Sequence, residues 1–258
     1  MTDKDILSYI KADNINLMLF DSVASTNDLL REMAKEGKPE GCVVVANEQT
    51  AGKGRRGRTF FSPSDSGIYM SILLRPQVEV SNSLFVTTAA AVAVSRAIEN
   101  VCNVKTAIKW VNDIYIDDRK VSGILTESAT APNSSMTQYI VLGIGVNLYH
   151  PKSGFPREIS SVATAVINEN RQDDNQRAKL VAEIINEFFG IYPLSDDEIF
   201  KEYKSRLFLI GKTVKVFSGS EEYDAEVIDI DREYRLCVKK QDGTIIKLDS
   251  GEVSTKLS

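Results

Sequence analysis

The sequence predicts an α+β fold in which a larger unit of strands and packed helices is followed by a small β-barrel. Strand-like apolar runs alternate with helical patterns up to residue 210. From Lys212 the chain changes to short alternating strands separated by turns such as Asp242-Gly243, a dipeptide typical of hairpins. With 258 residues, 43% of them hydrophobic, the chain can bury a large core. We therefore expect two domains, residues 1–210 and 211–258.

Hydrophobic periodicity predicts the individual elements. In the first domain, strands are expected at residues 15–20, 42–46, 68–74, 108–111, 114–116, 121–125 and 138–147. Helices are expected at residues 2–10, 25–34, 82–100, 180–188 and 196–210. In the second domain, strands are expected around residues 214–216, 223–227, 236–238 and 246–248. Capping residues mark the first two helices, because Thr2 pairs with Asp5 in a capping box and Ser25 precedes an apolar helical pattern.

Composition excludes several classes of protein. The three cysteines lie far apart without a CxxC pair, which suits a reducing compartment and argues against a disulfide framework or a zinc site. One histidine, His150, and the absence of a G-x-S-x-G motif argue against multi-histidine metal sites and serine hydrolases. The N-terminus has no signal-type apolar core, and we expect no apolar run of membrane-spanning length. These features predict a cytoplasmic protein without membrane partners.

Residues 47–63 form the most unusual stretch of the sequence. Between Gly52 and Arg58, three glycines alternate with four cations. Glycine lets backbone N–H groups approach an anion closely, and guanidinium groups donate bidentate hydrogen bonds to phosphate or carboxylate. A solvated surface turn is the ordinary interpretation of a basic run. We favour an anion-binding loop, because glycine and arginine are interleaved.

Three familiar motifs do not explain this loop. Gly52-x-Gly54-x-x-Gly57 matches the dinucleotide fingerprint, but turn residues follow it where a helix must begin. A phosphate-binding P-loop needs Ser or Thr after Gly-Lys, and Gly54 stands there. A nucleic-acid arm is disfavoured by the net charge of −5 and by the lack of a second basic cluster.

Four further patterns are candidates for a binding site. Ser25-Thr26-Asn27 is either a helix cap or a neutral corner that could hydrogen-bond a urea or amide group. Asn112-Asp113 has the ordinary interpretation of a turn. Lys120 precedes an apolar strand, so it is expected to point inward and to need an anionic partner. Gly143 and Gly145 lie within a strand, which indicates close approach by a ligand or another backbone.

Taken in order, these patterns resemble the biotin protein ligase family over essentially the whole chain. Each motif alone is weak, but their joint order and spacing are specific. The matching motifs are Ser25-Thr26-Asn27, Gln49 with the Gly52–Arg58 loop, Lys109-Trp110-Val111-Asn112-Asp113, Arg119-Lys120-x-x-Gly123, Gly143-x-Gly145-x-Asn147 and the closing Ser250-Gly251-Glu252-Val253-Ser254.

The resemblance implies a mixed-sheet catalytic domain with packed helices, followed by a Src-homology-3-like barrel. It also implies an ATP-dependent reaction in two steps: biotin is activated to biotinoyl-AMP and then transferred to a lysine of a biotin carboxyl carrier protein or domain. By motif, the resemblance assigns catalysis to Lys120 and Arg55 and the metal, Mg²⁺, to Asp113. The implied biotin-binding residues are Ser25, Thr26, Asn27, Gln49, Gly52, Lys53, Gly54, Arg55, Lys120 and Gly123. The implied ATP-binding residues are Arg55, Arg58, Asn112, Asp113, Lys120 and Asn147.

The sequence departs from the family pattern at three positions. Lys53 stands where arginine is frequent, which keeps the charge but loses the bidentate fork. Val111 replaces the usual proline, which is expected to loosen the Asn-Asp corner, and Phe60 replaces a frequent tryptophan. Some members carry a DNA-binding helix-turn-helix before the catalytic domain. Because 24 residues precede Ser25 here, we expect no DNA partner.

Two alternatives stay open at this point. A lipoyl or octanoyl ligase or transferase of the same superfamily also uses a core lysine, although the Gly/Arg loop and the neutral corner favour biotin. A non-enzymatic phosphate or nucleic-acid binder would use the loop but leaves Lys120 and Asn112-Asp113 without a role. The sequence is compatible with a monomer or a homodimer.

Overall fold

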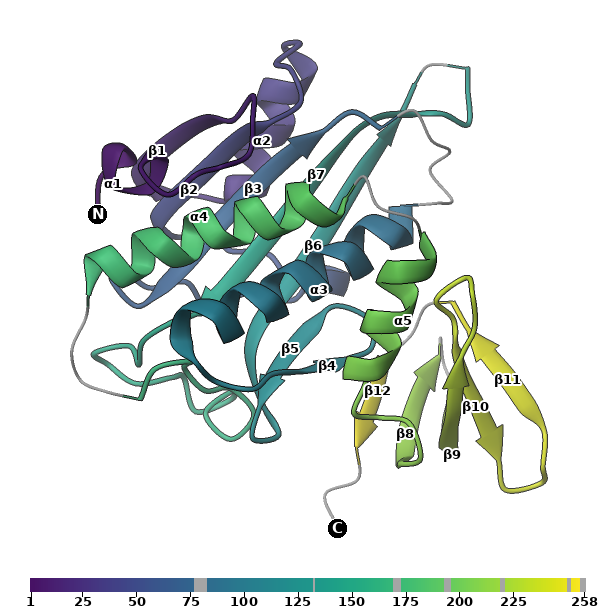
Figure 1. Cartoon of the computed structure of the whole chain (residues 1–258). Coiled ribbons are helices and arrows are strands. Elements are labelled where there is room, and N and C mark those ends of the chain that lie inside the picture. Colours follow the sequence, from purple (N-terminus) through teal and green to yellow (C-terminus); the bar gives the residue numbers. More distant parts are fainter. Residues whose placement is uncertain are drawn as a thin grey trace.

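Two β-sheets organise the molecule, a seven-stranded mixed sheet and a five-stranded antiparallel sheet (Figure 1). The structure is a computed structural model that describes residues 1–76, 83–131, 133–168, 173–192, 196–218, 221–249 and 252–255. In the large sheet the strand order is β1-β2-β3-β7-β6-β5-β4. Its strands are β1 (Asn16–Val23), β2 (Cys42–Gln49), β3 (Gly67–Leu74), β4 (Ala107–Lys109), β5 (Asp113–Ile116), β6 (Arg119–Thr130) and β7 (Thr137–Asn147).

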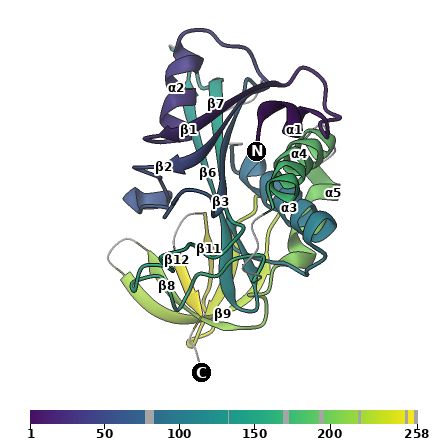
Figure 2. The ribbon, with the colours of Figure 1, turned by 90° about the vertical axis from the view of Figure 1, so that its left-hand side faces the viewer.

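Helices cover both faces of the large sheet, as the turned view in Figure 2 shows. On one face, α2 (Thr26–Lys35) packs through Leu30 and Ala34 against Val44, Leu73 and Val141. The opposite face carries the main core together with α1, α3, α4 and α5. These four helices are α1 (Asp3–Leu7), α3 (Ser83–Cys102), α4 (Asp174–Ile191) and α5 (Asp196–Arg206). Strands buried on both faces need apolar side chains throughout, which explains the continuous apolar runs in β2 and β3.

The small sheet follows α5 and has the order β11-β10-β9-β8-β12. Its strands are β8 (Thr213–Ser218), β9 (Glu221–Ile230), β10 (Leu236–Lys240), β11 (Ile245–Leu248) and β12 (Glu252–Thr255). The α+β fold class predicted from sequence is confirmed. Apolar residues of both sheets belong to one continuous buried cluster, so the division into residues 1–210 and 211–258 stays a prediction.

Local signals located most elements correctly. Thr2 and Asp5 form the expected capping box, and the Ser25 side chain accepts a hydrogen bond from the Asp28 backbone N–H at the start of α2. The turn between β5 and β6 has positive φ at Asp117 (46°) and Asp118 (59°), as a tight hairpin turn requires at both central residues. The predicted start of α3 at residue 82, the turn residues 219–220 and the closing residues 250–251 lie outside the described residues.

Three expectations were wrong. Helix α5 ends at Arg206 and not near residue 210, because Leu207 forms a bridge with Ile108 of β4. Strand β12 was not predicted as a strand; it pairs with β8 over four residues. The segment Leu84–Cys102 of α3 is long and apolar enough to span a membrane, contrary to expectation. That segment is 67% buried, because α3 packs between the sheet and the helices α4 and α5.

An ion-pair network ties α3, α4 and α5 together at the back of the sheet. Arg96 Nε lies 3.0 Å from Glu202 Oε1, and Arg96 Nη1 lies 3.3 Å from Glu187 Oε2. Arg206 donates to Glu202 and to Glu99, both at 2.9 Å. Burial alone would raise the pKa of Glu202, but the hydrogen bonds from Arg96 and Arg206 outweigh it and hold the pKa below its ordinary value of 4.5.

We predict that Glu202→Gln lowers the free energy of unfolding by about 1–2 kcal/mol at pH 7, since it removes the negative charge shared by two arginines and replaces one acceptor oxygen by an NH2 donor. A carboxylate whose pKa is lower in the folded state stabilises above its unfolded pKa and stops doing so as the pH falls through the folded pKa. The difference between variant and wild type should therefore shrink as the pH falls below 4.5. Urea denaturation at pH 7 and at acid pH measures it, with Glu36→Gln, at the exposed C-cap of α2, as the control. A pH-independent difference would contradict the assignment.

Candidate active site

One face of the large sheet carries a cavity of about 390 Å³ beside the Gly52–Arg58 loop. Ligand pockets usually lie in this size range. Every site residue predicted from sequence lines it except Gly52. Gly52, the first residue of the loop, is buried, and an added Cβ there would lie 2.4 Å from the Phe60 carbonyl oxygen. The fold therefore brings together motifs that are separated by more than a hundred residues.

A neutral hydrogen-bonded corner forms one wall of the cavity. The Gln49 side-chain oxygen accepts hydrogen bonds from the backbone N–H and hydroxyl of Thr26, at 2.9 and 3.1 Å. Ser71 donates to Asn27 Oδ1 at 2.6 Å, and Asn27 Nδ2 donates to Glu127 Oε2 at 2.7 Å. These partners fix the orientation of both amides, so the wall offers preoriented, uncharged donors and acceptors.

Lys120 reaches the cavity because of a one-residue bulge in β6. Ile114 on β5 pairs with Ser122, whereas the next residue, Tyr115, pairs with Lys120, so Val121 is the extra residue. Successive side chains point to opposite faces of a strand, and the bulge therefore places Lys120 on the same face as Gly123. An added Cβ on Gly123 would lie 3.0 Å from Lys120 Nζ. Glycine at position 123 leaves room for the ammonium group.

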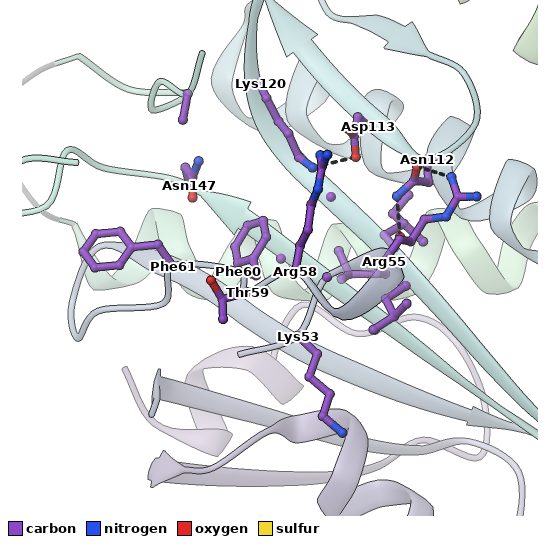
Figure 3. Close-up of a pocket in the computed structure, with 18 of the residues that line it drawn as sticks. Lys53, Arg55, Arg58, Thr59, Phe60, Phe61, Asn112, Asp113, Lys120 and Asn147 are labelled. Atoms are coloured by element: carbon purple, nitrogen blue, oxygen red, sulfur yellow. Dashed lines mark hydrogen bonds and ion pairs between the residues drawn. The ribbon is translucent and has the colours of Figure 1, made fainter. Parts of the chain in front are cut away.

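The corner between β4 and β5 supplies partners for two of the cations. Lys120 Nζ lies 2.7 Å from Asp113 Oδ1, which gives the expected anionic partner of this inward lysine (Figure 3). Arg55 Nη1 donates to Asn112 Oδ1 at 3.0 Å, and Asn112 Nδ2 donates to the Ile124 carbonyl at 2.7 Å. The corner thus links the Gly/Arg loop to β6 and does more than reverse the chain.

The Gly/Arg loop folds as a narrow hairpin over the cavity. Lys53 and Thr59 form an antiparallel bridge, and the Gly54 N–H donates to the Arg58 carbonyl at 2.7 Å. Figure 3 shows the Arg58 side chain extending toward Lys120 and Asp113, whereas Lys53 points away from them. Lys53 Nζ instead lies 2.5 Å from Asp28 Oδ1 at the start of α2.

The two glycines of β7 make room for side chains and not for another backbone. An added Cβ on Gly143 would lie 2.2 Å from Asn27 Oδ1, and one on Gly145 would lie 2.6 Å from the Phe60 ring. The sequence predicted that another group lies close to these glycines, but it named a ligand or a backbone, whereas the groups are the side chains of Asn27 and Phe60. Phe60 covers Gly145 and also lies against Gly123. It forms part of the cavity lining at the exit of the loop.

Sequence reasoning missed several residues of the site. Glu127 follows Gly123 and Leu125 at two-residue spacing on β6, and this alternation could have identified it. Ser71 is a fully buried hydroxyl in an otherwise apolar strand, which is another usable signal. Glu127 and Ser71 support Asn27 from outside the lining, whereas Ile159, Val162, Ala163 and Val253 line the cavity itself. These lining residues come from the loop after β7 and from β12, and no local sequence pattern predicts their place in the site.

Comparison with known proteins agrees with this arrangement. Residues 19–147 match the Biotin/lipoate A/B protein ligase family, and residues 209–256 match the Biotin protein ligase C terminal domain. The bifunctional ligase/repressor BirA of Bacillus spizizenii is 30% identical over 250 residues, which cover 92% of this chain and 73% of the relative. The chain belongs to the biotin protein ligase family.

Other members of the family support the same assignment. A biotin–[acetyl-CoA-carboxylase] ligase of Mycobacterium tuberculosis is 29% identical over 242 residues, covering 89% of this chain and 85% of the relative. The solved structure of a biotin protein ligase from Aquifex aeolicus in complex with biotin and ATP aligns with a TM-score of 0.75 at 26% identity. That alignment covers 94% of this chain and 99% of the other. The similarity to biotin protein ligases thus extends over both sheets.

We predict that Gly143→Ala destabilises the protein by about 1–3 kcal/mol, because the new methyl group overlaps the Asn27 amide in a packed site. Gly190→Ala is the matched control. Gly190 lies within α4 and has no heavy atom within 4 Å of an added Cβ, so this change should stabilise by about 0.5–1 kcal/mol. Thermal unfolding of both variants measures the contrast. Equal shifts in the same direction would show that the Asn27 contact does not constrain position 143.

Proposed function

We propose that the cavity binds biotin and ATP together, makes biotinoyl-AMP and passes the biotinoyl group to a lysine of a biotin carboxyl carrier domain. The polarity of the cavity carries the proposal. A neutral corner at Thr26, Asn27 and Gln49 suits the ureido ring of biotin. The cations Lys120 and Arg58 extend toward one another elsewhere in the same cavity (Figure 3). They suit the biotin carboxylate and the phosphates of ATP.

In the first step, an oxygen of the biotin carboxylate attacks the α-phosphorus of ATP, and diphosphate leaves. Both reactants are anions, so their approach has to be offset by fixed positive charge. Lys120 supplies this positive charge between the two groups. Its ammonium group is positioned by Asp113, whose Oδ1 lies 2.7 Å from Lys120 Nζ. Positioning and charge stabilisation are sufficient for this chemistry, since neither reactant needs a protein nucleophile.

In the second step, the amine of the acceptor lysine attacks the carbonyl carbon of biotinoyl-AMP. An amide bond forms, AMP leaves with its phosphate, and the amine loses a proton. The mixed anhydride hydrolyses if water reaches it, so a cover over the cavity protects it until the acceptor arrives. The Gly52–Arg58 hairpin, fastened through Arg55 to Asn112, has the position of such a cover.

The residues present fit a magnesium ion bound together with the nucleotide. Within the part of the chain that the structure describes, no three His, Cys, Asp or Glu side chains form a metal cluster. Mg²⁺ does not need one, because it is usually held by one or two carboxylates together with substrate phosphates. Asp113 would provide the carboxylate, and the ion would offset phosphate charge in the first step.

Incubation with radiolabelled biotin and ATP tests the proposal directly. Labelled biotinoyl-AMP should appear without an acceptor, and label should move to a carrier domain when one is added. In a parallel incubation, lipoate or octanoate replaces biotin. A lipoyl or octanoyl ligase would form an adenylate only there and not with biotin, and that result would overturn the proposal. The absence of a DNA partner, a cytoplasmic location and the monomeric or dimeric state stay predictions.

We predict that Lys120→Ala slows biotinoyl-AMP formation by about 10²–10³-fold, as expected when one charge-stabilising donor is removed. Single-turnover assays with saturating ATP measure the rate. Lys120→Arg is the matched variant, since it keeps the charge and should retain part of the rate. Lys179→Ala, on α4 outside the cavity lining, should leave the rate unchanged. A near wild-type rate in Lys120→Ala would remove this lysine from the mechanism.

We predict that Arg55→Gly speeds release of biotinoyl-AMP more than it slows its synthesis. The change removes the 3.0 Å hydrogen bond between the hairpin and Asn112 and leaves the Lys120–Asp113 pair intact. Arg56→Gly is the control, because it removes the same charge from an exposed residue of the same hairpin. The off-rate of biotinoyl-AMP and the labelling of an unrelated protein are the readouts. Equal off-rates in the two variants would show that Arg55 does not fasten the cover.

A further inference from the structure

The Asn112–Asp113 corner is held from behind by two residues that lie far away in the sequence. The hydroxyl of Tyr203 on α5 donates to the Val111 carbonyl at 2.9 Å. The indole N–H of Trp110 donates to the Tyr234 carbonyl at 2.9 Å. Both hydrogen bonds are buried. One is made by Trp110 and the other by Val111, the two residues immediately before Asn112.

The support behind the corner is a packed aromatic group that joins α5 to the small sheet. Tyr203 is fully buried, and its ring meets that of Tyr234 edge-on, with centroids 5.7 Å apart. Phe200 packs on Tyr234 in the same manner at 5.5 Å. Burial raises the pKa of Tyr203 well above its ordinary value, so the hydroxyl stays protonated and available as a donor. A rigid donor in this place constrains the peptide that it contacts.

We propose that Tyr203 is a positioning residue for the nucleotide side of the active site. It acts through the Val111 carbonyl on the neighbouring Asn112 and Asp113. The turn that carries Tyr234 holds the other end of the same segment, so the small sheet takes part in positioning the corner. The inference rests on the proposed function, because it assigns the corner to ATP.

The contacts predict a selective effect. Asn112 and Asp113 hold Arg55 and Lys120, whereas the neutral corner is built from Thr26, Gln49 and their neighbours on other elements. Removing the Tyr203 hydroxyl leaves the Val111 carbonyl without this donor and frees the corner to shift. Small displacements of a positioning group lower rates strongly. The use of ATP should suffer far more than biotin binding, because the contacts of the biotin ring lie at the neutral corner, away from Asn112 and Asp113.

Tyr203→Phe and Tyr234→Phe in the full chain form a matched pair for the experiment. Each removes one buried hydroxyl and keeps the ring, but the Tyr234 hydroxyl donates to Asp196 and not to the corner. For Tyr203→Phe we expect the KM for ATP to rise about tenfold, with the KM for biotin changed less than about twofold. For Tyr234→Phe we expect both constants to stay within about twofold of wild type.

Trp110 provides a second readout, because it is the one tryptophan of the chain and lies at the corner. Titration of its fluorescence with a non-hydrolysable ATP analogue should show the same loss of affinity in Tyr203→Phe alone. Equal losses in both variants, or parallel losses for ATP and biotin, would reduce Tyr203 to a general contribution to stability and overturn the inference. If the wild-type protein forms no biotinoyl-AMP, the proposed function fails instead.

Discussion

Charge compensation around the cavity is the interaction on which the site depends. Four cations within seven residues of one hairpin repel one another. The hairpin is fastened to α2 through Asp28 and to the β4–β5 corner through Asn112, while Lys120 is held by Asp113. The partners come from two separate parts of the fold, α2 and the β4–β5 corner, so the placement of the charges depends on tertiary structure. Anionic substrates that enter this region meet cations already held in place, which lowers the cost of ordering them.

The bulge in β6 gives the sheet its functional face. A strand without the extra residue would direct Lys120 into the core side of the sheet, where α3 packs. With it, one face of β6 carries Lys120, Gly123 and Glu127 in a row, from the charged part of the cavity to the neutral corner. A single backbone irregularity thereby brings the cationic part of the cavity next to its neutral part, as the proposed reaction requires.

Local sequence signals predicted the elements well wherever the signal was itself local. Caps, alternating strands and the Asp117-Asp118 turn were located because short-range hydrogen bonding and backbone sterics determine them. Features set by tertiary packing were not. Strand β12 depends on pairing with β8, and the end of α5 depends on a bridge to Ile108. In the site, the residues named from the motifs line one cavity, apart from Gly52. The packing of Phe60 over Gly145 and of Glu127 beside Asn27 follows from side-chain directions in three dimensions, which the motifs do not give.

The shared core of the two sheets has a consequence for how such enzymes can be recombined. Tyr234 lies in the turn between β9 and β10 of the small sheet. Its ring packs against Phe200 and Tyr203 of α5, and its carbonyl accepts a hydrogen bond from Trp110. A chimera that received the small sheet of another family member would also need that member's residues at positions 110, 200 and 203. The small sheet is therefore not an interchangeable module, and exchange across residue 211 is expected to succeed only when both sides of the aromatic group are transplanted together.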